Sequence, residues 1–191
     1  MDILSPILAL ILAAVVVMGS PGPSTISMTA VGAAYGLRHS VGYLSGLVVG
    51  TTAVLIAVAA GVVSVLFSVP QLAPVLLGAS AVYMLYLAFR IATAPPLSKQ
   101  DGAVAPSFAG AFLLAVANPK AYLAIAAVFA GSTLEAPAKI AVLTAMIVVI
   151  HICWLLAGAS LARFFYDPVH SRIANAVFAA TLVATTVFIF L

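Results

Sequence analysis

The chain has 191 residues, of which 65% are hydrophobic and only 6% are charged, with a formal net charge of +3 and a mean hydropathy of +1.32. A soluble domain is roughly 45–50% apolar and about 25% charged, so lipid must be the solvent for most of this chain. Its few basic residues are too scattered for a nucleic-acid surface, which needs them clustered on one face, and no nucleic-acid partner is expected.

The first apolar stretch predicts a broken helix. Between positions 2 and 38 the chain has no Asp, Glu, Lys or Arg. One straight helix of this length would reach about 50 Å, against a hydrocarbon core of about 30 Å. Pro21-Gly22-Pro23 lies in its middle, and each proline removes a backbone donor and clashes with the preceding turn. We therefore expect a first span over 3–34, interrupted at the prolines, and a loop at Arg38-His39.

Five further spans are predicted along the rest of the chain. Turn-forming residues near Pro70 divide the next charge-free stretch into two helices, and the prolines and charges of 93–107 form a linker. The fourth helix is interrupted by Asn118-Pro119-Lys120, and loops holding Glu135 and Asp167 separate the last three helices. The predicted spans after the first are 41–67, 72–89, 108–130, 140–162 and 173–191.

Basic residues in the loops predict the orientation. The loop after the fourth span holds Lys139 and the loop after the second holds no basic residue, whereas those after the first, third and fifth hold Arg38, Arg90, Lys99, Arg163 and Arg172. Cytoplasmic loops carry the excess of Lys and Arg. Both termini are therefore expected outside.

The linker at 95–106 divides a single transmembrane domain, 1–191, into half-repeats of about 1–94 and 107–191. Ser20-Pro21-Gly22 lies 98 residues before Asn118-Pro119-Lys120, and the same offset aligns the second span with the fifth and the third with the sixth. With three spans each, the halves would be inverted. Such paired, interrupted helices are typical of transporters whose substrate site lies where the breaks meet. The alternative is that each proline only kinks a helix for packing.

Polar side chains inside the predicted spans are candidate site residues. Lys120 is the basic residue that lies deep in a span, where a charge costs about 2.5–3.5 kcal/mol on insertion scales and is usually functional. It would neutralise a substrate carboxylate, or alternatively cap the carbonyls of a broken helix or snorkel to the interface. Asn118 would bind a ligand or satisfy freed backbone. His151 is a candidate proton relay, with an ordinary hydrogen bond to a neighbouring helix as the alternative.

Other residue types predict packing rather than chemistry. Gly42, Gly46 and Gly50 recur every four residues, a spacing that lets helices approach closely. The three histidines lie on different segments and Cys153 is the single cysteine. We therefore expect no metal site, no cofactor and no enzymatic activity.

Several of these motifs together resemble the LysE/RhtB family of bacterial amino-acid exporters, over essentially the full length. They are Pro21-Gly22-Pro23, the glycine stripe, Tyr83-Met84-Leu85-Tyr86-Leu87-Ala88-Phe89, and Phe108 followed by Asn118-Pro119-Lys120-Ala121. The resemblance implies export of amino acids or close derivatives across the bacterial inner membrane, driven by an ion gradient and often as a homodimer. It carries over Pro21, Gly22, Pro23, Asn118, Pro119 and Lys120 as substrate-binding residues. The last span departs from the family, because it has no glycine.

The sequence thus favours an all-α, multi-pass secondary exporter of a neutral or weakly polar amino acid. No predicted span contains an Asp or Glu that would pair with a second ammonium. One alternative is export of another solute, such as a metal cation, on the same scaffold, although the spans lack a Cys, His or carboxylate cluster. The other is a membrane structural or assembly protein that transports nothing.

Overall fold

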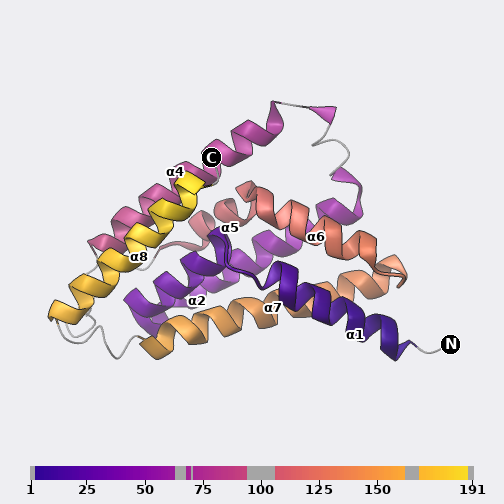
Figure 1. The fold of residues 1–191 in the computed structure, drawn as a ribbon, viewed down its shortest axis with the longest axis horizontal. Coiled ribbons are helices and arrows are strands. Elements are labelled where there is room, and N and C mark those ends of the chain that lie inside the picture. Colours follow the sequence, from indigo (N-terminus) through magenta and orange to yellow (C-terminus); the bar gives the residue numbers. More distant parts are fainter. Residues whose placement is uncertain (1–2, 63–67, 70, 94–105, 162–167, 189–191) are drawn as a thin grey trace.

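The computed structural model describes residues 3–62, 68–69, 71–93, 106–161 and 168–188, and all elements in these ranges are helices (Figure 1). In chain order they are α1 (Leu4–Ala13), the π-helical turn η1 (Ala14–Met18), α2 (Pro23–Ala59), α4 (Leu72–Ala92), α5 (Phe108–Ala117), α6 (Pro119–Gly131), α7 (Ala136–Leu161) and α8 (Pro168–Phe188).

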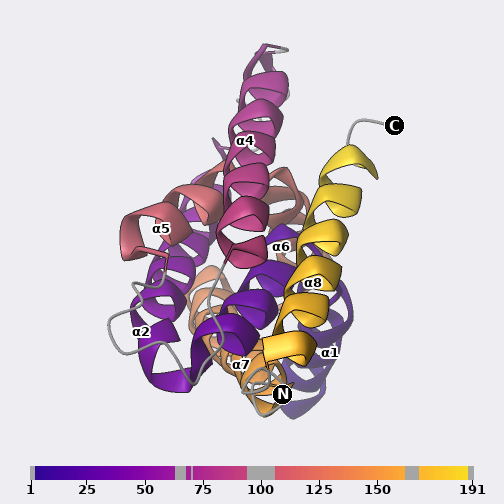
Figure 2. The same ribbon diagram turned by 90° about the vertical axis from the view of Figure 1, so that its left-hand side faces the viewer.

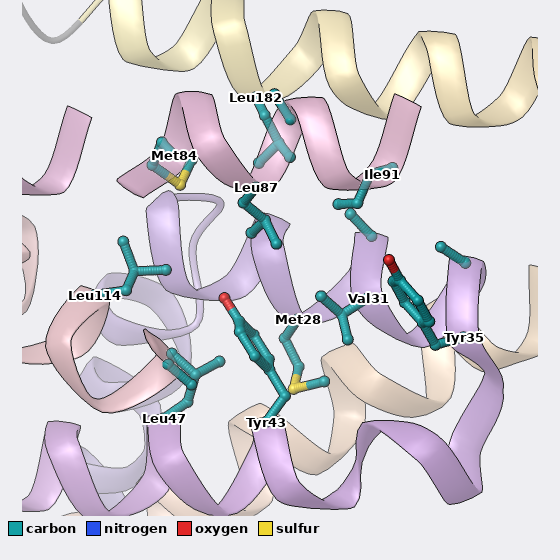
Figure 3. Close-up of a cluster of buried hydrophobic side chains, with 14 of the residues drawn as sticks. Met28, Val31, Tyr35, Tyr43, Leu47, Met84, Leu87, Ile91, Leu114 and Leu182 are labelled. Atoms are coloured by element: carbon teal, nitrogen blue, oxygen red, sulfur yellow. The ribbon is translucent and has the colours of Figure 1, made fainter. Parts of the chain in front are cut away.

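Helix α2 consists of two legs that reverse at Gly36. This glycine has φ 71° and ψ 175°, a conformation that costs a residue with a Cβ much more than it costs glycine. The Ser40 hydroxyl donates to the Val31 carbonyl at 3.2 Å, although residues nine apart in a straight helix are separated by about 13 Å. The legs, 23–35 and 37–59, therefore lie side by side, as Figure 3 shows for the residues labelled on each leg.

This reversal corrects the predicted first loop. Arg38 and His39 were expected in that loop, but both are helical residues of the second leg. The chain turns two residues earlier, because the positive φ is available to Gly36 and not to the polar pair. The turn still separates the first two predicted spans.

Several helix ends also differ from the prediction. Helix α2 ends at Ala59 rather than at 67, and Gly61 follows with a φ of 83°. Helices α7 and α8 begin at Ala136 and Pro168, a few residues before the predicted 140 and 173. Proline is accommodated in the first turn of a helix, where its missing N–H would have no partner. Residues 63–67 and most of the linker at 95–106 lie outside the described residues.

Helix α2 holds the fold together, since it contacts α4, α5, α6, α7 and α8. Small residues allow its closest approaches. A Cβ at Gly46 would meet the carbonyl oxygen of Phe108, and one at Gly50 would lie 2.7 Å from the Ala115 Cβ. A Cβ at Gly42 would meet no described atom within 4 Å outside its own helix backbone. Two glycines of the predicted stripe thus pack against α5, whereas Gly42 makes no such contact within one chain, and the packing of helices between protomers stays a prediction there.

We expect Gly46→Ala and Gly42→Ala to have opposite effects on stability. The new Cβ at position 46 meets backbone, which cannot move aside as a side chain end can, and overpacking of this kind costs about 1–3 kcal/mol. Gly42→Ala adds a methyl group in open space and should stabilise the helix by up to about 1 kcal/mol. Thermal unfolding in detergent measures both. Equal melting temperatures for the two variants would contradict the packing described here.

Two apolar clusters form the interior. The first joins both legs of α2 to α4, α5 and α8, with Met28, Tyr43, Leu87 and Leu182 among its buried members (Figure 3). Helices α4 and α8 lie side by side (Figures 1 and 2), and α8 packs through Ala179 and Leu182 although its described residues include no glycine. The second cluster joins α1, η1, the second leg of α2, α6 and α7.

The outward faces are apolar as well. Large exposed side chains occur on every helix that the structure describes and include Leu12, Val82, Phe89 and Leu156. Among the described residues, α2 and α7 are long and apolar enough to cross a membrane, and α5 with α6 forms a third candidate span as a bent pair. An apolar core inside an apolar surface is the arrangement expected of a protein in lipid.

Candidate functional site

The first predicted interruption lies between η1 and α2. The helical segment ends at Met18, and α2 starts at Pro23, its first residue. Gly22 is fully extended, with φ −175° and ψ −179°. Proline suits the first position of a helix because its N–H would be unpaired there. The Pro-Gly-Pro motif therefore ends one half-helix and begins another.

The second predicted interruption lies between α5 and α6. Asn118 is extended, with φ −79° and ψ 105°, and Pro119 is again the first residue of the following helix. The axes of the two half-helices differ by 61°. The Asn118 Oδ1 accepts a hydrogen bond from the Lys120 N–H at 3.1 Å and so caps α6. Both predicted interruptions are present.

Lys120 joins the two breaks, which lie about 100 residues apart in sequence. Its Nζ donates to the carbonyl and the hydroxyl of Ser20, at 2.6 and 2.8 Å, and to the Pro21 carbonyl at 2.8 Å. An ammonium group has three protons to donate, and here all three have acceptors. In this conformation the lysine therefore caps the broken first helix, which was one of the readings left open by the sequence.

Further side chains hold the breaks together. The Asn118 Nδ2 donates to the Ser24 hydroxyl at 3.0 Å. The Trp154 Nε1 of α7 donates to the Gly19 carbonyl at 3.1 Å. The Thr25 hydroxyl accepts from the Gly22 N–H at 2.8 Å. The unwound backbone is thus satisfied by side chains from three helices, as backbone at membrane depth must be.

A cavity of about 40 Å³ lies between the two breaks and α7. A water molecule needs about 10–15 Å³ by this measure, so a few waters fit but an amino acid does not. The cavity is lined by Met18, Gly22, Ser24, Thr25, Thr51, Asn118, Lys120, Ala121, Ala124, Ile125, Ile147, Ile150 and His151. Four sequence-predicted site residues, Gly22, Asn118, Lys120 and His151, therefore meet here. Pro21, Pro23 and Pro119 shape the breaks and are outside the lining.

The electrostatics around the two breaks suit an anion. Helices α2 and α6 both begin at the cavity, and a helix N-terminus carries a partial positive charge. The Lys120 ammonium adds a full positive charge. Among the described residues that line the cavity there is no Asp or Glu to balance it. A carboxylate is the common biological group that fits such a surface.

His151 contributes a different kind of polar atom. Its Nδ1 lies 2.7 Å from the Ile147 carbonyl. A carbonyl oxygen only accepts, so Nδ1 must carry the proton, and Nε2 is the acceptor when the ring is neutral. That Nε2 is buried without a hydrogen-bond partner, and so is the Thr51 hydroxyl from the second leg of α2.

Sequence reasoning missed Ser24, Thr25 and Thr51. The first two had a signal, because hydroxyl residues directly after a helix-starting proline are placed to satisfy the free N–H groups of the first turn. Thr51 had only its position beside Gly50, within a helix that carries other hydroxyls. Its place in the cavity depends on how α2 and α7 pack.

Broken apolar helices that meet at a positively charged cavity are the architecture of a membrane translocator. The chain belongs to the LysE family, since the model of the LysE type translocator matches residues 15–191. The chain is 33% identical over 182 residues to the cysteine/O-acetylserine efflux proteins of Escherichia coli K12 and Shigella flexneri, with 90% of both chains covered. The protein of that name from E. coli O1:K1 is 32% identical over the same length. No solved structure matches the chain.

The predicted resemblance to amino-acid exporters is thereby confirmed. The chain is a multi-pass inner-membrane transporter of the amino-acid export type, and it is not an enzyme.

Proposed function

We propose that the chain is a secondary exporter of small neutral amino acids or their close derivatives, driven by an ion gradient. One observation carries the proposal: both helix breaks meet at one cavity that has a lysine and two helix N-termini but no acid. O-acetyl-L-serine and L-cysteine are the first candidate substrates, because relatives that are 33% identical to this chain are named as efflux proteins for these two compounds.

The substrate carboxylate would bind where Lys120 now holds the first break. A hydrogen bond from an ammonium to a carboxylate joins two opposite full charges, whereas one to a carbonyl joins a charge to a neutral dipole. An entering carboxylate therefore competes with the carbonyls of Ser20 and Pro21 for the protons on Nζ. Once those bonds are exchanged, the link between the two breaks loosens and the cavity is able to widen. The substrate itself would thus trigger the change between inward and outward access.

The helix bounds support an inverted repeat within one transmembrane domain. Subtracting 98 places α5 on 10–19, α6 on 21–33, α7 on 38–63 and α8 on 70–90. These ranges match, in order, α1 with η1, the two legs of α2, and α4. The proposed six spans are α1 with η1 and the first leg, the second leg, α4, α5 with α6, α7, and α8. We also propose that both termini lie outside, from the basic residues of the loops, and that the protein forms a homodimer, from the family resemblance.

The alternatives have less support. Within the described ranges, no three His, Cys, Asp or Glu side chains come together where they would hold a metal ion. A cation exporter would need such ligands along its path. A structural protein without transport would have no use for a polar cavity at a pair of helix breaks, because buried polar groups are costly in lipid.

Reconstituted protein tests the proposal. Proteoliposomes with an imposed pH gradient should move labelled O-acetyl-L-serine and L-cysteine, and a protonophore should abolish accumulation. L-lysine is the matched control, since its second ammonium would find no acid in the cavity. Equal retention of all amino acids in liposomes with and without the protein would overturn the proposed function.

A further inference from the structure

The polar groups opposite the helix breaks suggest how export is coupled. We propose that the His151 Nε2 and the Thr51 hydroxyl form a second subsite that receives the ammonium group of the substrate, and that a proton and a substrate occupy Nε2 in turn. The inference rests on the proposed function. It assigns both a binding role and the coupling role to one imidazole nitrogen.

Burial is the first observation behind this subsite. Both residues line the cavity, and their side chains are more than nine-tenths buried: His151 is 4% exposed and Thr51 is 6% exposed. The Nε2 and Oγ1 atoms have no hydrogen-bond partner. Native proteins leave few buried polar atoms unpaired, because each forfeits its hydrogen bond to water. Two such atoms in one cavity indicate that a ligand supplies the missing bonds.

Hydrogen-bond polarity shows which ligand group fits. The Nδ1–H donates a hydrogen bond to the Ile147 carbonyl, so Nε2 of the neutral ring is an acceptor. The Thr51 hydroxyl also accepts. At the helix breaks, by contrast, the lining includes the Lys120 ammonium, whose protons are now held by Ser20 and Pro21, and the positive N-terminal ends of α2 and α6. A zwitterionic amino acid matches this division, with its carboxylate at the breaks and its ammonium at His151 and Thr51.

Few other charges act on His151. Lys120, from α6, is the other ionisable side chain in the cavity lining. Of the elements packed against α7, α1 and η1 contain no ionisable residue, and α2 contributes Gly22, Ser24, Thr25 and Thr51 to the lining. Among the described lining residues, a protonated His151 would therefore meet the Lys120 cation and no anion. An ammonium group would be repelled from it.

Mutually exclusive binding of this kind produces antiport. Neutral His151 accepts the substrate ammonium on the cytoplasmic side, and departure of the zwitterion outside frees Nε2 to take a proton there. The proton leaves Nε2 inside before the next substrate binds. One proton enters for each zwitterion exported, and one positive charge moves inward per cycle. No covalent bond to carbon is made or broken.

Trp154 provides a direct binding assay. It is the single tryptophan of the chain, and its indole contacts the break through the Gly19 carbonyl. Its fluorescence in detergent should report titration with O-acetyl-L-serine between pH 5 and 8. In the wild type, we expect the Kd to rise tenfold for each pH unit below the pKa of His151. N-acetyl-L-serine, an isomer with a blocked amine, should not lose affinity on acidification, and this comparison needs no variant.

The variants separate binding from coupling. His151→Gln keeps an acceptor of similar size, so we expect a Kd that no longer changes with pH, retained exchange of substrate for substrate, and no accumulation under a pH gradient. Thr51→Val should weaken binding about tenfold without changing the pH response. His39→Gln is the matched control, because His39 also bonds its Nδ1 to the carbonyl four residues earlier but is exposed and outside the cavity.

Two results with His151→Gln would overturn the inference. One is a pH-dependent Kd in His151→Gln equal to that of the wild type, and the other is gradient-driven accumulation by that variant. If the Kd of the wild type for O-acetyl-L-serine and for N-acetyl-L-serine rose equally on acidification, that result would also contradict the inference. These outcomes differ from failure of the proposed function, in which the wild type itself would neither bind nor move an amino acid.

Discussion

Replacing Lys120 with alanine should lower the export of O-acetyl-L-serine by about 100-fold. The substitution removes the full positive charge of the cavity and the donors that would bind a carboxylate. A hydrogen bond to a charged group is worth about 1.5–3 kcal/mol, and 1.4 kcal/mol is tenfold in an equilibrium constant, so the loss of one or two such bonds gives this magnitude. Initial rates of efflux from loaded proteoliposomes measure the effect.

Two further variants serve as controls for the effect of Lys120→Ala. Lys120→Arg keeps the charge, but its planar fork differs from the compact ammonium, so we expect partial activity. Lys139→Ala removes a lysine whose Nζ lies 4.9 Å from the centre of the Phe129 ring, outside the cavity, and export should stay within about twofold of the wild type. Full export by Lys120→Ala would show that the lysine only caps the broken helix.

Gly22→Ala should reduce export by about tenfold or more, because the new methyl group displaces Lys120. A Cβ at this position would lie 2.6 Å from the Lys120 Cδ and 2.8 Å from its Nζ. The backbone there is extended and suits any residue, so the glycine is needed for space. The flexible lysine end would swing away and lose its position. The melting temperature should fall less than in Gly46→Ala, whose Cβ meets backbone.

A double variant tests this mechanism. If alanine at position 22 acts by displacing Lys120, adding Gly22→Ala to Lys120→Ala should cause little further loss, because contacting residues are not additive. Gly131→Ala, at the end of the helix that begins beside Lys120, has no atom within 4 Å of its new Cβ and should export normally. If the losses in the double variant were additive, Gly22→Ala would not act by displacing Lys120.

The helix interruptions could be predicted from sequence because proline acts locally. Pro23 and Pro119 remove a donor whatever surrounds them, and each becomes the first residue of a helix. The reversal at Gly36 could not be predicted in the same way. Nothing in the sequence gives the sign of φ, and Arg38-His39 is the stronger polar signal nearby. Charges mark the membrane surface, whereas the turn itself is made by the glycine.

The candidate site was predictable to the extent that its residues are tied to the breaks. Asn118 and Lys120 flank Pro119, so the same motif that interrupts the helix also supplies polar side chains. Whether Lys120 caps the first break is a tertiary question, which its contacts with Ser20 and Pro21 decide. The position of Thr51 depends on the packing of α2 against α7, and a single sequence does not encode that angle in any local pattern.

The bond between Lys120 and the first break also has a consequence for biosynthesis. At about 5–20 residues per second, the ribosome completes Lys120 some 5–20 s after Ser20. During that interval the carbonyls of Ser20 and Pro21 lack the ammonium that satisfies them in the finished protein. The N-terminal half therefore depends on the C-terminal half, which supplies the Lys120 ammonium that completes the hydrogen bonding of the first break.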